Sequence, residues 1–466
     1  MRGSSRRGRG WPPAMAGLPP NAPVLWRANR PEGSGTPEKT RDRTATVSCG
    51  TGNAPPKCSH SSCLTLSSHF RVLQIMLNIA FLGQPTHHGE NVAILLKSRG
   101  LEIHNLEDSP GYGVYGRTEF SSRGRNGVFS RAWQKARRTY SQLHGTFDED
   151  YCAYLLKRVD DGEIDCILAY WGTNPLADIV FLKRYRPHIK IILNVLCHPM
   201  GINPTKISFQ NFLMQRSASL IDGFVFPSEE MRTYFRKHCG LRAPSLVMPP
   251  YLSEAFSSVG QSSPQEKSPN LVFLGRMDWN AGQPSDNVEA ALRCMMESGI
   301  HVFHCRSASK RPRHENQHEF EPVEMTQLRP FMARFDASLI VYNLEVCQRL
   351  DRFRNTVPDR LLSSVSSGIP IALPRTGYEA CKEFLRDYRA VLEYDSPGEL
   401  KEMLSDASFL QEMKSFAKMD RPLYFGENYI DNLVDFILRV HHSDFAASNH
   451  REDRRRQSSR FLWASH

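Results

Sequence analysis

The sequence contains no long hydrophobic run. No segment approaches the roughly 18 consecutive apolar residues that a membrane-spanning helix needs, and residues 1–75 lack the apolar stretch of a secretory signal. Hydrophobic residues make up 40% and charged residues 23% of the 466 positions, as in globular proteins. We therefore expect a cytoplasmic protein without a transmembrane segment, and we leave peripheral membrane contact and the oligomeric state open.

Most of the chain also lacks the excess of positive charge that nucleic-acid-binding proteins carry. The formal net charge is +10, but residues 1–70 hold ten Lys and Arg against three Asp and Glu. Residues 445–466 hold five Arg against two acidic residues, so the two ends account for the whole excess. Because nucleic-acid affinity depends on clustered basic residues, we expect no nucleic-acid partner.

Metal-binding and disulfide patterns are missing as well. Cys58, His60 and Cys63 lie close together but have no second ligand pair at zinc-finger spacing. The eleven cysteines are scattered, and five of them lie in or beside apolar segments, as expected for reduced core thiols of an intracellular protein. These five are Cys152, Cys166, Cys197, Cys294 and Cys347. We expect neither a metal nor another cofactor.

The glycine motif of dinucleotide-binding enzymes is absent too. The first apolar run is followed by GQPTHHG, which does not match G-x-G-x-x-G. No acidic residue ends the second apolar run at the position that binds a ribose in such enzymes. These absences argue against a nicotinamide-dependent dehydrogenase.

What the sequence does contain is an alternation of short apolar runs and helical patterns. It occurs on both sides of a polar segment and predicts two α/β, Rossmann-like, doubly wound lobes. The expected divisions are a disordered or over-extended start at 1–75, an N-terminal lobe at 76–252, a linker at 253–270, a C-terminal lobe at 271–425, an amphipathic helix at 426–444 and a basic mobile tail at 445–466.

One stretch, Phe353–Glu379, combines a helix, a buried strand and the start of a second helix. Asn355 or Thr356 is suited to cap the first helix, with Pro358 in its first turn. Gly368 stands where helices commonly end. Counted along this helix, Asn355 and Ser363 would lie about two turns apart on one face.

The second half of the same stretch predicts an anion-binding turn. An apolar run from Ile369 to Leu373 is typical of a strand buried on both faces. Gly377 and Tyr378 then allow the chain to enter the next helix. Two helix N-termini beside one parallel strand would bind an anion without a metal, because their free N–H groups and dipoles point at it.

The segment SSGIPIALP, which ends at Pro374, resembles the donor half of nucleotide-sugar glycosyltransferases of the GT-B fold, above all the large retaining family four. That family has two Glu residues separated by seven positions, which fall here on Asn355 and Ser363, so neither is a carboxylate. The resemblance extends from Met76 to Asp444. It implies two lobes facing a cleft and a C-terminal helix that crosses back to the first lobe.

The resemblance also implies a donor site. Arg276, in FLGRMD, would lie beside the donor diphosphate and take part in catalysis. The family has a lysine shortly after this arginine, and Ala281 stands at that position here. Arg360 is a candidate for the missing second cation. Each of these residues also has a purely structural alternative. The arginines would be surface residues, Asn355 and Ser363 would cap or line a helix, and Gly377 and Tyr378 would form an ordinary turn. The implied donor contacts are Arg276, Asn355, Pro358, Arg360, Ser363, Gly377 and Tyr378.

On the other lobe, the resemblance implies a catalytic histidine and an acceptor loop. His198, in VLCHPMG, would lie near the donor sugar and the acceptor, although a buried structural histidine is the alternative. Gly83, His87 and His88 correspond to the acceptor-side loop. The Tyr- and Arg-rich segment Ser109–Asn126 is either a second acceptor contact or a solvated loop.

The function implied by the resemblance is a glycosyltransferase. It would move a sugar from a nucleoside-diphosphate sugar to an unidentified glycan, lipid or small-molecule acceptor, with retention of configuration and without a metal. The missing Glu and Lys residues favour an alternative, a catalytically impaired relative that binds a sugar nucleotide or a protein partner.

Overall fold

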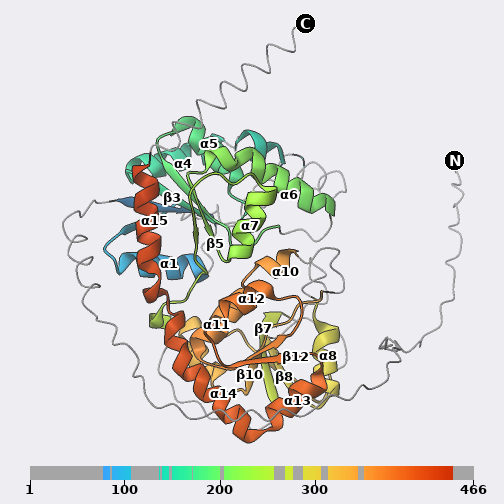
Figure 1. Cartoon of the computed structure of the whole chain (residues 1–466). Coiled ribbons are helices and arrows are strands. Elements are labelled where there is room, and N and C mark those ends of the chain that lie inside the picture. The colour runs from blue at the N-terminus through green and yellow to red at the C-terminus, as the bar shows by residue number, and fades with distance from the viewer. Residues whose placement is uncertain are drawn as a thin grey trace, which may run out of the picture. The chain divides into compact units, whose positions relative to one another are not determined.

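Two six-stranded sheets form the framework of the protein. The computed structural model describes residues 77–83, 87–106, 136, 139–145, 149–170, 172–199, 204–256, 268–276, 287–305, 313–344 and 351–443, all within one unit of the chain, Leu73–His466. Within each sheet, every neighbouring pair of strands is parallel. Helices connect the strands (Figure 1), which confirms the predicted doubly wound α/β class.

The first sheet has the strand order β2-β1-β3-β4-β5-β6. Its strands are β1 (Asn78–Leu82), β2 (Glu102–Asn105), β3 (Cys166–Tyr170), β4 (Lys190–Asn194), β5 (Gly223–Phe226) and β6 (Ser245–Val247). The helices between them are α1 (His87–Lys97), α4 (Glu149–Asp161), α5 (Leu176–Tyr185), α6 (Pro204–Ser217) and α7 (Glu229–His238). We call this part the N-terminal lobe.

The second sheet has the order β12-β11-β10-β7-β8-β9. Its strands are β7 (Asn270–Arg276), β8 (His301–Cys305), β9 (Gln317–Phe320), β10 (Ala337–Leu339), β11 (Ile371–Pro374) and β12 (Val391–Tyr394). Its helices are α8 (Glu289–Glu297), α9 (Leu328–Met332), α10 (Asp351–Asn355), α11 (Asp359–Ser367), α12 (Glu379–Phe384), α13 (Pro397–Ser405) and α14 (Ala407–Asp420). We call this part the C-terminal lobe.

Inner strands of each sheet, such as β3 and β11, are buried on both faces because they are apolar at nearly every position. In β3, Ile167 and Ala169 join the hydrophobic cluster on one face, and Cys166, Leu168 and Tyr170 join the cluster on the other. This alternation follows from the two-residue period of a strand. The same division in β11 sends its residues to two separate clusters.

The last helix, α15 (Ile430–His442), follows the C-terminal lobe in sequence but packs on the N-terminal lobe. Phe436 and Val440 lie in the same hydrophobic cluster as Ile79. Gly223 permits close packing, since a Cβ there would stand 2.9 Å from a methyl group of Val440. Figure 1 shows α15 running beside α1. The chain therefore returns to its first lobe at the end.

Two aromatic residues mark the place where the chain crosses between the lobes. Tyr251, after β6, stacks on Tyr429, before α15, with ring centroids 3.9 Å apart and an angle of 7° between the planes. Close by, the Glu427 carboxylate accepts hydrogen bonds at 3.1 Å from the main-chain N–H of Glu254. The outgoing and the returning segment thus pack on each other.

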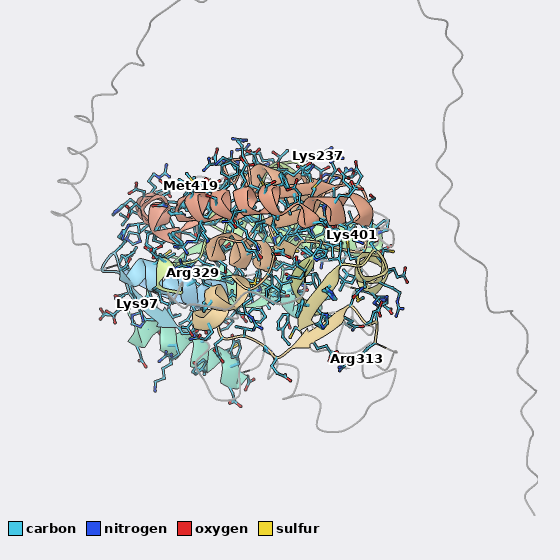
Figure 2. The ribbon with its side chains drawn as sticks, turned by 90° about the horizontal axis from the view of Figure 1, so that it is seen from below. Lys97, Lys237, Arg313, Arg329, Lys401 and Met419 are labelled. Carbon is cyan, nitrogen blue, oxygen red and sulfur yellow. The ribbon has the colours of Figure 1, made fainter. Side chains whose placement is uncertain are left out.

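Charged side chains project from the surface, as Lys97, Lys237 and Lys401 do in Figure 2. Among the described helices, none combines the length and the apolarity required to cross a bilayer. No disulfide bond joins the cysteines of the described residues. One cysteine prediction was wrong, because Cys294 is exposed on α8 rather than placed in the core.

β9 is a half-buried edge strand that lacks an apolar run. One local prediction was also wrong. The helix expected to hold both Asn355 and Ser363 is divided. Asn355 ends α10, and α11 begins four residues later with Pro358 as its N-cap rather than in its first turn.

Candidate functional site

The C-terminal ends of three adjacent strands form the candidate site in the C-terminal lobe. β11, β10 and β7 are neighbours, so the residues that follow them lie in one row, the usual place for ligands in parallel sheets. Gly275 and Arg276 end β7, Val341 and Tyr342 follow β10, and Gly377 follows β11. Arg276 pairs with β8 after a register shift; its side chain lies outside the described residues.

Arg360 reaches this row from the first turn of α11. Its Nη2 donates a hydrogen bond to the carbonyl oxygen of Val341 at 2.9 Å. Its guanidinium carbon lies 4.1 Å from the ring centroid of Tyr342 and 5.0 Å from that of Phe273. These cation–π contacts hold the charge in place. The structure therefore brings Arg360 to the strand that carries Arg276.

Gly275 makes room for this arrangement. A Cβ at position 275 would stand 2.9 Å from Nη1 of Arg360 and 2.4 Å from the ring of Phe273. Only a residue without a side chain allows the guanidinium to approach the main chain so closely. The glycine that precedes Arg276 thus has a steric role beside the predicted cation.

Gly377 and Tyr378 form the turn between β11 and α12. Gly377 has φ of +90°, which favours glycine. The hydroxyl oxygen of Tyr378 accepts a hydrogen bond from the Tyr342 N–H at 2.8 Å. Burial raises the pKa of Tyr378 above its usual range, while this hydrogen bond and the charge of Arg360 oppose the rise. Tyr378 therefore links the segments that follow β10 and β11. Its hydroxyl oxygen already accepts a hydrogen bond from the main chain.

Three predicted donor contacts do not lie at the strand ends that form the candidate site. They are Asn355, Pro358 and Ser363. Asn355 is buried, and its carbonyl oxygen accepts a hydrogen bond at 2.7 Å from the Ser228 hydroxyl of the N-terminal lobe. Pro358 is buried and caps α11 without a side-chain hydrogen bond. Ser363 is half-buried, and its carbonyl oxygen accepts from the hydroxyl of Ser367 at 2.7 Å. Asn355 and Ser363 belong to different helices, so the shared face predicted for them does not exist.

His198 lies in the core of the N-terminal lobe. It is 1% exposed, and its Nε2 lies 2.8 Å from Oδ1 of Asn211, whose amide nitrogen donates to the Tyr234 hydroxyl. Its ring also meets Phe235 edge-on. Burial lowers the pKa of His198 to about 4, with the Asn211 hydrogen bond acting in the opposite direction. This geometry favours the structural alternative for His198, and a role in catalysis stays a prediction.

The acceptor-side residues follow β1. Gly83 has φ of +103°, and a Cβ there would stand 2.8 Å from the carbonyl oxygen of Tyr170, so the turn passes closely over the end of β3. His87 and His88 are the first two residues of α1; their side chains lie outside the described residues. So does the whole segment Ser109–Asn126, whose contact with an acceptor stays a prediction.

Segment 355–358 contacts the N-terminal lobe at two points. One is the hydrogen bond from Ser228 to Asn355, and the other is a contact of 3.8 Å between the Thr356 hydroxyl and Sγ of Cys197. Within the C-terminal lobe, Sγ of Cys381 lies 3.6 Å from the carbonyl oxygen of Thr356. Cys197, the residue before His198, thus contacts the segment between α10 and α11, although the His198 ring itself packs inside its own lobe.

Sequence reasoning missed Tyr342 and the inter-lobe contacts. An aromatic residue directly after the apolar run of β10 was the available signal for Tyr342. No sequence pattern indicates that Ser228 meets Asn355, because these residues are far apart in the chain. Within the described part of the chain, no group of three or more metal-ligating side chains is present, which leaves the prediction of a metal-free site untested.

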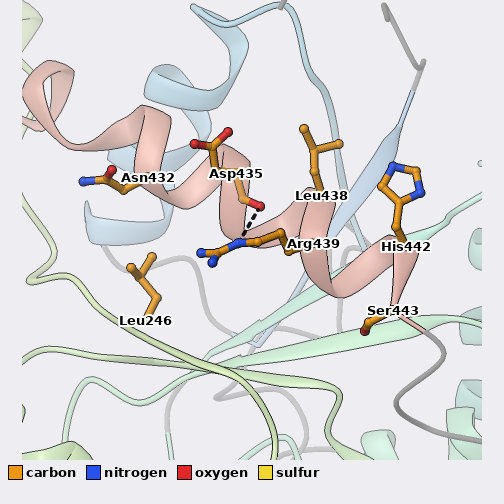
Figure 3. A pocket seen from close by; sticks show the side chains of 7 residues that line it. All are labelled: Leu246, Asn432, Asp435, Leu438, Arg439, His442 and Ser443. Carbon is orange, nitrogen blue, oxygen red and sulfur yellow. Dashed lines mark hydrogen bonds between the residues drawn. The ribbon is translucent and has the colours of Figure 1, made fainter. Parts of the chain in front are cut away.

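A surface hollow elsewhere contains none of the predicted site residues. It lies between α15 and the edge strand β6 (Figure 3). Its wall includes Arg439, whose Nε donates to the carbonyl oxygen of Asp435 at 3.4 Å. The lining residues are Leu246, Asn432, Asp435, Leu438, Arg439, His442 and Ser443.

Comparisons with known proteins agree with the arrangement of the two sheets. No family model and no curated protein matches the sequence. Among solved structures, a sucrose-phosphate synthase from Thermosynechococcus elongatus is 8% identical with a TM-score of 0.54, over 78% of this chain and 98% of that chain. An E. coli structure described as trehalose-6-phosphate bound with UDP-2-fluoro glucose is 12% identical with a TM-score of 0.51, over 78% and 99%.

A further match is a trehalose-6-phosphate synthase, OtsA, at 11% identity and a TM-score of 0.51, over 78% of this chain and 98% of that chain. At such low identity the similarity concerns the fold. It agrees with the two parallel six-stranded sheets and their helices described above. The chain therefore has the GT-B fold of nucleotide-sugar glycosyltransferases.

Proposed function

We propose that the protein transfers a glycosyl group from a nucleoside-diphosphate sugar to an acceptor molecule. The observation that carries this proposal is the position of Arg360 at the ends of β7 and β10. Among the described residues, its buried Nε has no hydrogen-bond partner and no carboxylate forms an ion pair with it. A half-buried cation that lacks an anionic partner is suited to bind a diphosphate.

Three features converge on the place where the diphosphate would lie. Arg276 is the last residue of β7, Gly275 leaves room beside Arg360, and the turn at Gly377 follows β11, the second strand from β7 in the sheet. Positive charge fixed before the reaction stabilises the negative charge that develops on the leaving nucleoside diphosphate. We infer that Arg276 and Arg360 supply this charge and that the reaction needs no bound metal. Retention of configuration is part of the proposal, by likeness to the retaining family four.

The second candidate is a relative that binds the donor but turns it over slowly or not at all. Asn355 and Ser363 favour it, since neither carries the charge of the Glu residues in the family pattern. Hydrolysis or transfer from radiolabelled donors separates the two candidates. Release of labelled sugar supports transfer, whereas donor binding without release, across a panel of donors and acceptors, supports the alternative.

Thermal unfolding with nucleotides tests the proposal. The panel is UDP, GDP and ADP, each with its glucose and mannose conjugates. A ligand that binds only the folded state at 100 times its Kd stabilises it by about 2.7 kcal/mol, so the best ligand should raise the Tm clearly. The variant Arg276→Ala should abolish this shift, because it removes the cation beside the diphosphate.

The matched control is Arg313→Ala. Arg313 is an exposed arginine that precedes β9 and therefore lies near the amino end of that strand, opposite the proposed site. Its removal should leave the nucleotide-induced shift unchanged. Equal shifts for Arg276→Ala and the wild-type protein would contradict the placement of the diphosphate, and the absence of any shift across the panel would contradict the proposed function.

A further inference from the structure

The first turn of α7 carries two neighbouring carboxylates with different surroundings. Glu229 is exposed and accepts a hydrogen bond at 3.0 Å from Nε of Arg232. Glu230 is half-buried, and its Oε2 is buried without a hydrogen-bond partner among the described residues. Either residue would satisfy the helix dipole. The dipole therefore does not explain why Glu230 is turned inward.

An unpartnered buried carboxylate oxygen calls for an explanation. Leaving such a group without a hydrogen bond costs stability, and most buried polar atoms have partners. Arg360, from the other lobe, also has a buried atom without a partner, its Nε. Glu230 and Arg360 come from different lobes and have opposite charges. Arg158 and Arg421 also have a buried Nε without a partner among the described residues.

The contacts of α7 bring Glu230 to the lobe boundary. Ser228, two residues earlier, caps α7 by accepting from the Met231 N–H at 3.1 Å, and its hydroxyl donates to the Asn355 carbonyl oxygen at 2.7 Å. Because one hydroxyl makes both contacts, the start of α7 is held against α10. Glu230 is therefore fixed close to the segment that leads into α11 and Arg360.

The thiol of Cys381, in the C-terminal lobe, lies 3.6 Å from the carbonyl oxygen of Thr356, next to the residue that Ser228 contacts. Burial raises the pKa of Cys381 to about 12. The positive charge of Arg360 lowers this pKa, whereas the negative charge of Glu230 raises it. The charges of Arg360 and Glu230, which come from different lobes, thus act on the same buried thiol in opposite directions. Glu379 also raises the pKa of Cys381 through its negative charge. Its Oε1 lies 3.4 Å from Nε of Arg354 in an exposed ion pair.

We propose that Glu230 binds hydroxyl groups of the donor sugar while Arg360 binds the diphosphate of the same molecule. A carboxylate offers two acceptor oxygens, which suits neighbouring hydroxyl groups of a sugar. The uncharged side chains of Asn355 and Ser363 offer weaker acceptors there. This inference rests on the proposed function and adds to it a residue of the N-terminal lobe, so that a complete donor site requires both lobes.

The test compares Glu230→Gln with Glu229→Gln by titration calorimetry, using UDP, GDP and ADP and their glucose and mannose conjugates. Sugar contacts are measured as the ratio of the Kd of the nucleoside diphosphate to that of its sugar conjugate. In Glu230→Gln this ratio should fall by about tenfold, as expected for a lost hydrogen bond to a charged group. The Kd of the free nucleoside diphosphate should stay the same, since Arg360 is unchanged.

Glu229→Gln alters the same turn of the same helix and should keep the wild-type ratio. If Glu230→Gln does not fold, Glu230→Asp, which withdraws the carboxylate by one methylene, takes its place with the same expectation. An unchanged ratio in these variants would overturn the role of Glu230 while leaving the diphosphate site intact. Failure of the wild-type protein to bind any of these nucleotides would instead overturn the proposed function, and this inference with it.

Discussion

At the scale of single residues, His198 makes stability depend on pH. Its pKa is about 4 in the folded protein because the ring is buried, against about 6.5 in an unfolded chain. Between these pH values the unfolded state binds more protons than the folded state. The contribution of neutral His198 to the free energy of unfolding is therefore fully present above pH 6.5 and is lost as the pH falls toward 4. The loss attributable to His198 is on the order of 3 kcal/mol.

Denaturant titrations from pH 7 to pH 4 check this prediction with His198→Gln, which cannot take up a proton. The variant should be less stable at pH 7, because the contact with Asn211 is disturbed, but its stability should decline less steeply below pH 6.5. Parallel pH profiles for the variant and the wild-type protein would show that His198 is not buried in its neutral form.

A second residue-scale prediction concerns Gly275. In Gly275→Ala the new methyl group would stand 2.4 Å from Phe273 and 2.9 Å from Arg360, and relief of this overlap should cost about 1–3 kcal/mol of stability. Nucleotide binding should weaken as well, because the guanidinium moves. Denaturant titration and calorimetry measure the two effects.

Gly398→Ala is the control for this substitution. A Cβ at position 398 would meet only Oγ of Ser396, at 3.9 Å, and the site lies in α13. This change should be neutral or stabilising by up to about 1 kcal/mol, with nucleotide binding unaffected. If both alanine variants behave alike, Gly275 does not make room for Arg360.

At the scale of helices and strands, the N-cap of α7 should matter more than an ordinary cap. Ser228 caps its helix and also donates to Asn355 across the lobe boundary. Ser396 caps α13 by accepting from the Glu399 N–H at 3.2 Å, at an exposed site. Ser396→Ala should cost about 1 kcal/mol, and Ser228→Ala about 2–3 kcal/mol, because a buried carbonyl oxygen also loses its donor.

The free energies of unfolding of the two alanine variants test this comparison directly. Equal losses would mean that the hydroxyl of Ser228 contributes nothing across the lobe boundary.

Elements with strong local signals could be predicted from the sequence. Gly368 ends α11 with φ of +71°, as its position after the helical pattern indicated, and the apolar run before Pro374 is β11. Weak local signals failed. β9 is an edge strand with half-buried polar residues, and the break between α10 and α11 depends on Pro358, which the sequence suggested would lie inside one helix.

The candidate site was predictable only in part, for a physical reason. The conformational preferences of Gly377 and Tyr378 predict a turn. Arg360 lies in the same stretch of sequence, Phe353–Glu379. The inward turn of Glu230 and the contact between Thr356 and Cys197 depend on how two lobes pack. Such contacts join residues that are far apart in the chain and have no local pattern.

At the scale of the whole molecule, the N-terminal lobe is completed by the end of the chain. α15 contributes Ile430, Phe436, Ile437 and Val440 to the hydrophobic cluster on one face of the first sheet. Each such side chain stabilises the fold by about 1.5–3 kcal/mol when buried. A fragment spanning residues 76–256 should therefore show no cooperative unfolding transition. The chain ending at residue 443 should unfold cooperatively.

Circular dichroism during heating distinguishes these outcomes. A fragment of residues 76–256 with a sharp thermal transition near that of the longer chain would show that α15 is not part of the first lobe's core.

The central claim is that the ends of β7, β10 and β11 bind the diphosphate of a nucleotide sugar. A crystal structure with the best ligand of the nucleotide panel tests it most directly. We predict the diphosphate within hydrogen-bonding distance of Arg276 or Arg360 and beside the turn at Gly377. A nucleotide bound elsewhere, with these arginines unoccupied, would contradict the account.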